Sequence, residues 1–148
     1  MNHKAVELLE FGKIRERVAA LTSFSGGREL VLALVPSSDI QWIEARQRET
    51  AEARTLLSLR PNFALGGVHD VRPAAGQAAL GGLLQPHQLQ DIKDTVQGGR
   101  IVQRALERVC DHVPALWRRA QRMPDCQAVE NEINRCIGPR GEIGRAHD

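Results

Sequence analysis

The chain is poor in aromatic residues, which make up 3% of its 148 residues and include no tyrosine. Apolar residues nevertheless account for 42% of the chain, so its core has to be built from aliphatic side chains. The two isolated tryptophans, Trp42 and Trp117, cannot form the aromatic-rich surface on which nucleic-acid bases stack. We therefore interpret both indoles as packing residues.

Cysteine is also scarce, with thiols at Cys110, Cys126 and Cys136 and no Cys-x-x-Cys pair. Their number and spacing suit neither a zinc site nor a disulfide framework. The five histidines show no ligand spacing either, so the sequence predicts no metal site. We expect the thiols to be buried and reduced, as in a cytoplasmic protein.

No excess of one charge points to a partner, because 20 basic side chains stand against 18 acidic ones. No apolar run is long enough to cross a membrane, and the first residues lack the uninterrupted apolar core of a signal peptide. These absences predict a cytoplasmic protein with no membrane partner.

Motifs of catalysis are missing as well. Gly12 and Lys13 are followed by Ile14 instead of serine or threonine, which argues against a Walker A phosphate loop. Glu130 and Glu132 lie two positions apart on an expected helix and diverge, so they do not form an acid/base pair. The sequence therefore predicts no catalytic residue, no cofactor-binding residue and no enzyme activity of this chain alone.

What the sequence does contain is helical periodicity, with apolar residues recurring at steps of three and four. Glycine and proline divide this pattern into segments. It predicts an all-α protein of about seven helices in an irregular array, with no strand. The expected helices span residues 4–22, 28–35, 40–59, 72–79, 86–112, 113–123 and 126–137.

Two of these segments carry more detailed expectations. The helix at 28–35 is apolar on nearly all sides, which predicts that it is either buried or clamped by its neighbours. The long helix at 40–59 follows a proline break, and Ser38 or Asp39 can cap its start. In the first helix, Gly12 marks a weak point where a break is expected.

The longest apolar stripe belongs to the helix at 86–112. Gly98 and Gly99 interrupt it and are expected to bend it. Arg100, Arg104 and Arg108 follow at four-residue spacing, so three guanidinium groups share one face and are candidates to contact a phosphate backbone. The alternative, which is the more common role of a charge run, is a solvated face or pairing with acidic residues of a neighbouring segment.

Residues 65–73 form the best internal seam of the chain. Adjacent glycines allow positive φ or close backbone approach, an aspartate can cap the next helix, and a proline fits its first turn. We interpret this stretch as a joint between sub-blocks at residues 1–64 and 65–141. The residues expected to shape it are Gly66, Gly67, Asp70, Arg72 and Pro73.

The partner of Arg72 is the open question at this joint. Its guanidinium is expected to hold Asp70 or a carboxylate of the preceding helix. If it instead faces solvent unpaired, it becomes a candidate contact to another part of a larger protein.

Four short segments, in this order and spacing, resemble the N-terminal region of the second bacterial MutS family, the MutS-two proteins. They are LEFGKI at 9–14, PSSD at 36–39, LGGVHDVRP at 65–73, and CI at 136–137 followed by GEI at 141–143. The resemblance covers nearly the whole chain but only the beginning of such a protein. It implies that residues 1–141 form a MutS-type helical core and lever segment.

The resemblance also implies what lies beyond this segment. Family members continue into a helical clamp, an ATPase that dimerises and binds ATP and Mg²⁺, and usually a C-terminal nuclease domain. The family is linked to branched DNA, through suppression of recombination, and to ribosomes, through rescue of stalled ones. The chain is then a non-catalytic scaffold, whose parent acts as an ATPase and, where the nuclease domain is present, as an endonuclease.

A second interpretation comes from a different functional class. The chain can also be a free-standing helical module that binds another protein through the stripe at 86–112 or the face of 40–59.

Residues 142–148 depart from the family pattern. Residues 142–147 also match the translation of a common sequencing-adapter read. We therefore expect a truncated reading frame whose last residues are a disordered or artefactual tail.

Overall fold

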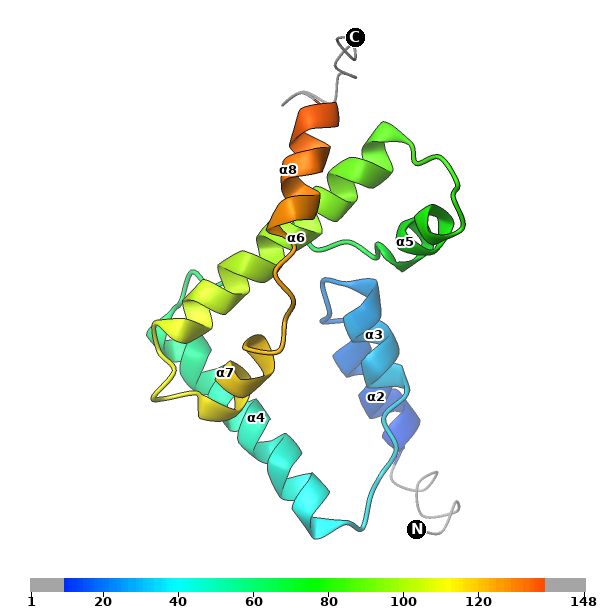
Figure 1. Ribbon diagram of the computed structural model, residues 1–148. Helices are drawn as coiled ribbons and strands as arrows, with labels where there is room; N and C mark the ends of the chain where they lie inside the picture. The colour runs from blue at the N-terminus through cyan, green and yellow to red at the C-terminus, as the bar shows by residue number, and fades with distance from the viewer. Residues whose placement is uncertain (1–9, 138–148) are drawn as a thin grey trace, which may run out of the picture.

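The computed structural model describes residues 10–137, and all regular structure in this part of the chain is helical. Figure 1 shows the helices as an irregular array, in which α4, α6 and α7 gather in one group while α2 and α3 lie together beside α5. The prediction of an all-α protein is confirmed. The helices are α2 (Phe11–Ala19), α3 (Ser25–Leu32), α4 (Ile40–Leu59), α5 (Arg72–Ala79), α6 (Pro86–Glu107), α7 (Pro114–Ala120) and α8 (Gln127–Cys136).

Helix α4 occupies the residues that the sequence predicted. Asp39 precedes it in an extended conformation, and its side chain accepts the backbone N–H of Trp42 at 3.1 Å. This bond satisfies one of the N–H groups that the first turn of a helix leaves free. Of the two predicted caps, Asp39 therefore acts and Ser38 does not.

Helix α2 begins later than the sequence predicted. Glu10 adopts a left-handed backbone conformation with φ of 51°, and the helix starts at the next residue, Phe11. The break expected near Gly12 thus lies at Glu10, immediately before the first residue of α2. The helix ends at Ala19, and the predicted residues 4–9 lie outside the described part of the chain.

Helix α3 corrects two expectations. It starts at Ser25, three residues before the predicted start, so Gly26 and Gly27 belong to its first turn instead of interrupting the chain. Of the two alternatives for this helix, burial is wrong, because none of its residues is buried and Leu30 is 74% exposed. An apolar segment in a small open array finds too few neighbours to cover all its sides.

Helix α6 runs without interruption through Gly98 and Gly99. It starts with Pro86 in its first turn and with a reciprocal capping pair between Gln85 and Gln88. It ends at Glu107, five residues before the predicted end, and turns follow up to Val113. Pro114 disfavours a helical conformation of the residue before it, which explains why α7 forms a separate helix.

The main core lies where α4, α6 and α7 meet. Its buried members are all aliphatic, which confirms the composition argument, and Trp117 packs against them as expected. They are Leu56, Leu106, Val113 and Ala120. Helix α8 packs on another part of α6, so α6 connects the core with the last helix (Figure 1).

A buried carboxylate ties α4 to α7. Glu52 is 7% exposed, and its Oε2 atom accepts the backbone N–H groups of Ala115 and Leu116 at 2.8 and 2.9 Å. These are N–H groups of the first turn of α7, where negative charge is favourable. The sequence analysis did not identify this residue, because a glutamate is not expected on a packed face.

The predicted burial of the three thiols is wrong. Cys110 and Cys126 are half-buried, Cys136 is exposed, and all three are free. Within residues 10–137, no His, Cys, Asp or Glu side chains cluster in threes as a metal ion would require. Among the described helices, none combines the length and the apolar character needed to cross a membrane.

Candidate functional site

The joint at residues 65–73 lies directly against α6. Gly67 has a φ of 73°, which is the left-handed region that glycine adopts without strain. A Cβ atom on Gly98 of α6 would lie 3.1 Å from Cγ2 of Val68 and 3.3 Å from the carbonyl oxygen of Gly66. The absence of a side chain at Gly98 therefore lets the joint approach the helix closely, and this explains the glycine that the sequence interpretation assigned to a bend.

Two polar contacts hold the same stretch along α6. The backbone N–H of His69 donates to the hydroxyl of Thr95 at 2.9 Å. The Nδ1 atom of His69 lies 3.7 Å from a carboxylate oxygen of Asp91. The joint is thus fixed to α6 before α5 begins.

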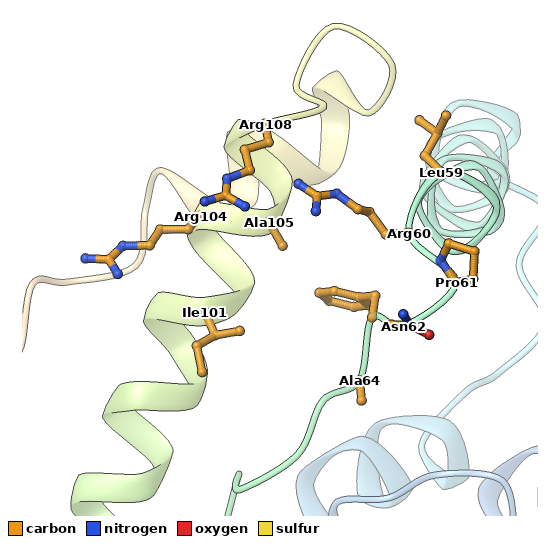
Figure 2. Close-up of a pocket in the computed structure, with 10 residues that line it drawn as sticks. Leu59, Arg60, Pro61, Asn62, Ala64, Ile101, Arg104, Ala105 and Arg108 are labelled. Atoms are coloured by element: carbon orange, nitrogen blue, oxygen red, sulfur yellow. The ribbon is translucent and has the colours of Figure 1, made fainter.

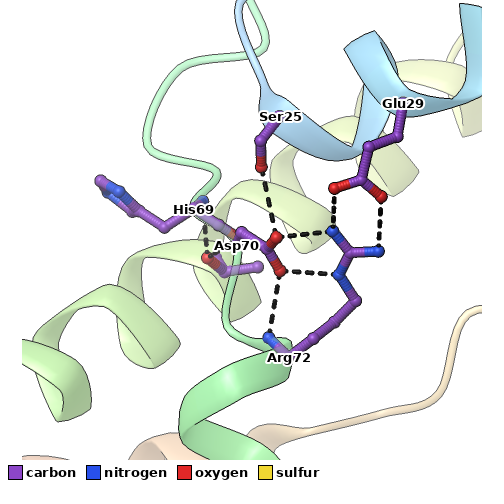
Figure 3. A network of polar contacts seen from close by, with 6 residues as sticks. Ser25, Glu29, His69, Asp70 and Arg72 are labelled. Carbon is purple, nitrogen blue, oxygen red and sulfur yellow. Dashed lines mark hydrogen bonds and ion pairs between the residues drawn. The ribbon is translucent and has the colours of Figure 1, made fainter. Parts of the chain in front are cut away.

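Beyond His69, the chain enters a network of charges that reaches α3 (Figure 3). The two terminal nitrogens of Arg72 donate to the two carboxylate oxygens of Glu29 at 2.9 and 2.8 Å. The Nε atom of Arg72 also donates to Asp70 at 2.7 Å. Arg72 therefore holds both Asp70 and a helix carboxylate, and that carboxylate comes from α3.

Asp70 does not hold the N-cap position of α5 that the sequence predicted for it, because Val71 does, and α5 has no side-chain cap hydrogen bond. Val71 is the residue that precedes α5, while Asp70 accepts the N–H of Arg72 at 3.2 Å and a hydrogen bond from Ser25 of α3 at 3.4 Å. Pro73 lies in the first turn of α5, as predicted. The joint therefore connects three helices, namely α3, α5 and α6.

The charges in this network stabilise one another. The hydrogen bond from Arg72 is the main cause that lowers the pKa of Asp70 to about 2. The same donor lowers the pKa of Glu29, and the two carboxylates, Asp70 first, raise the pKa of Arg72. Glu29 and Asp70 with lowered pKa values and Arg72 with a raised one keep their charges at neutral pH, which fits a structural clasp formed by these three residues and not an acid/base site.

The row of three arginines on α6 divides into two parts. Arg100 donates to the carboxylate of Glu130 and to the amide oxygen of Gln127, both on α8. Glu130 is 6% exposed and also accepts from Gln97 at 2.8 Å. Arg100 is thus part of the contact between α6 and α8.

Arg104 and Arg108 line a pocket between α6 and the end of α4. In Figure 2 the guanidinium group of Arg108 lies toward Arg60, whereas the side chain of Arg104 extends away from Arg60. The pocket has a volume of about 490 Å³. Arg60, which immediately follows α4, supplies a third guanidinium group from the other side. The lining residues are Leu59, Arg60, Pro61, Asn62, Phe63, Ala64, Ile101, Arg104, Ala105 and Arg108.

Sequence reasoning missed Arg60. The four-residue spacing on α6 identified Arg104 and Arg108, whereas Arg60 lies more than 40 residues away in sequence and joins them only through the packing of α4 on the shared core. No local pattern in the sequence predicts that Arg60 lies beside these two arginines.

No protein-family model matches the chain. Individual proteins do match it, and three of them are called endonuclease MutS2. The protein of Symbiobacterium thermophilum is 36% identical over 143 residues, which cover 97% of this chain and 18% of that protein. The protein of Bacillus cytotoxicus is 33% identical over 146 residues, which cover 97% of this chain and 19% of that protein.

The protein of Pelotomaculum thermopropionicum is 33% identical over 143 residues, with 97% of this chain and 18% of that protein covered. The chain thus spans slightly under a fifth of the length of these relatives. The similarity confirms the resemblance to the MutS-two family.

Proposed function

Because the chain is related to the endonuclease MutS2 proteins along nearly all of its length, we propose that it serves as a non-catalytic N-terminal scaffold. The parent protein would be a MutS2-like ATPase that binds DNA or ribosomes. The observation that carries this proposal is the extent of the similarity, which includes both sub-blocks and the joint between them. The ATP and Mg²⁺ of such a protein would be bound outside this chain, and dimerisation would use domains outside it.

The openness of the helical array supports a scaffold. Among residues 10–137, several large apolar side chains are left uncovered, and they include Leu21, Leu30, Leu80 and Leu83, each more than 70% exposed. Such a surface suits a segment that packs against further parts of a larger protein.

The target of the parent protein follows from the resemblance, which offers branched DNA in recombination or repair and ribosomes in rescue. Within the chain, Arg104 and Arg108 remain the candidate nucleic-acid contacts, because they line an open pocket. Arg100 forms an ion pair with Glu130 on α8, so it can contact a ligand only if that ion pair breaks.

The alternative of a free-standing interaction module is less favoured. One of its expected docking surfaces is the apolar stripe of α6, but Leu106 of that stripe is buried in the core, and α7 and α8 both pack on α6. A partner protein would have to displace these helices.

The non-catalytic part of the proposal is tested by assaying the purified chain for ATP hydrolysis and for cleavage of a four-way DNA junction. The MutS2 protein of Symbiobacterium thermophilum, assayed beside it, controls for the quality of the substrates. We expect the chain to show neither activity. Turnover that follows the chain through every purification step would contradict the proposal.

A further inference from the structure

We propose that the pocket between α6 and the end of α4 binds a nucleoside phosphate unit, either as a free nucleotide or as part of a nucleic-acid strand. This inference rests on the proposed function and deepens it, because it names the chemistry of a nucleic-acid contact within the scaffold. The site consists of Arg60, Arg104 and Arg108 together with the apolar residues between them.

The first argument is the charge of the pocket. Three guanidinium groups line it, and its lining contains no carboxylate. Figure 2 shows the side chain of Arg60 extending from the end of α4 toward Arg108 on α6, so that like charges face each other across the opening. Among residues 10–137, no carboxylate lies within ion-pairing distance of these three side chains. An anion from outside would relieve their mutual repulsion.

Several other arginines of the chain have a carboxylate partner. Arg46, Arg72, Arg100 and Arg119 each contact a glutamate of a helix. These four arginines thus support or join helices through a carboxylate that the fold itself supplies. The pocket is different, because it gathers positive charge from two elements without supplying a counterion.

The second argument is the shape of the anion that the pocket fits. A guanidinium group is a planar fork of donors that matches the oxygens of a phosphate, and several forks can share one phosphate group. Arg108 on α6 and Arg60 at the end of α4 extend toward each other from opposite sides (Figure 2), and Arg104 lies one turn before Arg108 at the edge of the pocket. A phosphate between α4 and α6 would therefore receive donors from two directions.

The third argument is the apolar part of the pocket, which a simple anion would leave uncovered. Ile101 is 62% exposed and Leu59 is 45% exposed, while Pro61 and Phe63 complete the apolar lining. A sugar and a base attached to the phosphate would cover this surface. The volume of about 490 Å³ lies within the range of roughly 300–1,000 Å³ that is usual for small-molecule sites.

The test is isothermal titration calorimetry, in which each of four probes is titrated into the purified 148-residue chain. The probes are 5′-AMP, adenosine, inorganic phosphate and a 5′-phosphorylated ten-nucleotide thymidine strand. We expect 5′-AMP to bind more tightly than adenosine and inorganic phosphate, because only the nucleotide engages both the guanidinium groups and the apolar lining. If the strand binds more tightly than 5′-AMP, the natural source is a nucleic acid, and if it binds no better, the source is a free nucleotide.

Variants assign the binding to the pocket. The double variant Arg104→Gln/Arg108→Gln should weaken 5′-AMP binding roughly tenfold or more, because it removes two charged donors. The single variant Arg60→Gln should weaken it from the other side of the pocket. The control Arg17→Gln/Arg54→Gln removes the same charge from exposed positions on α2 and α4 and should leave binding unchanged.

Two results would overturn the inference. One is that 5′-AMP does not bind, or binds equally to the pocket variants and to the control. The other is that an acidic peptide such as hexaglutamate competes as well as 5′-AMP, which would make the pocket a peptide site. Neither result bears on the assays of ATP hydrolysis and DNA cleavage, so failure of the pocket and failure of the scaffold proposal are distinguishable.

Discussion

Arg72 of α5 donates hydrogen bonds to both carboxylate oxygens of Glu29 on α3, although the two residues are 43 positions apart in the sequence. This ion pair, together with the contact of Ser25 with Asp70, joins the α2 and α3 pair to the start of α5 across the joint. The clasp and the close approach of the joint to Gly98 give residues 65–73 their conformation.

The first prediction concerns pH. The folded-state pKa of Asp70 is lowered from 3.8 to about 2, and that of Glu29 is also lowered. A lowered pKa means that the clasp contributes fully at pH values above the ordinary carboxyl pKa and is lost as the pH falls through the folded-state value. The distribution of distances between spin labels on α3 and α5 should therefore stay unchanged from pH 7 to about 5 and become broader between about pH 4 and 2. Broadening that begins near neutral pH would contradict this account.

The second prediction concerns the buried cap of α7. Replacing Glu52 with alanine removes the acceptor of two backbone N–H groups and should destabilise the protein by about 1–3 kcal/mol. Glu44→Ala, on an exposed position of the same helix, is the matched control and should change stability by less than about 0.5 kcal/mol. Urea unfolding measures both, and equal effects of the two substitutions would show that Glu52 is not a cap.

The third prediction compares two glycines within helices. Gly76 of α5 has open space where a Cβ atom would lie, so Gly76→Ala should stabilise the protein by up to about 1 kcal/mol. In Gly98→Ala the new methyl group meets Val68 and the carbonyl of Gly66, so this gain should be absent. Amide resonances of residues 66–69 should shift in Gly98→Ala alone. A similar gain in both variants, without such shifts, would exclude the close approach of the joint.

The fourth prediction separates the arginines of α6. Arg100→Gln leaves the buried carboxylate of Glu130 without its cation and should cost about 1–2 kcal/mol, since Arg100 itself is partly exposed. Arg104→Gln should lie within about 0.5 kcal/mol of the parent, because its side chain is exposed at the pocket. Thermal unfolding distinguishes them, and a larger loss in Arg104→Gln than in Arg100→Gln would reverse the assignment.

Local signals explain which parts of the fold the sequence predicts well. The proline break and the capping aspartate before α4 determine its start within the chain itself, and its predicted bounds are confirmed. Helix α3 was misplaced because Gly26 and Gly27 have low intrinsic helix propensity, while packing of α3 against α2 favours a helix there. Propensity is a weak signal when a neighbouring helix supplies contacts.

The contacts between distant residues could not be predicted from sequence. Nothing in the spacing of Glu52 indicates that it caps a helix more than 60 residues later, and nothing distinguishes Arg100 from Arg104 except the position of α8. The resemblance to the MutS-two proteins is confirmed by the similarity to the endonuclease MutS2 relatives, but the partner of Arg72 on α3 is visible only in three dimensions. The predicted tail at residues 142–148 lies outside the described residues.

The scaffold role is tested most directly by a segment exchange. The N-terminal segment of the MutS2 protein of Symbiobacterium thermophilum is replaced by residues 1–141 of this chain, and ATP hydrolysis is measured together with binding of four-way DNA junctions and of ribosomes. The account predicts that the chimera retains the ATP hydrolysis and the preferred target of the unmodified protein, whereas a variant lacking the segment loses them. A chimera that behaves like the deletion variant would contradict the account.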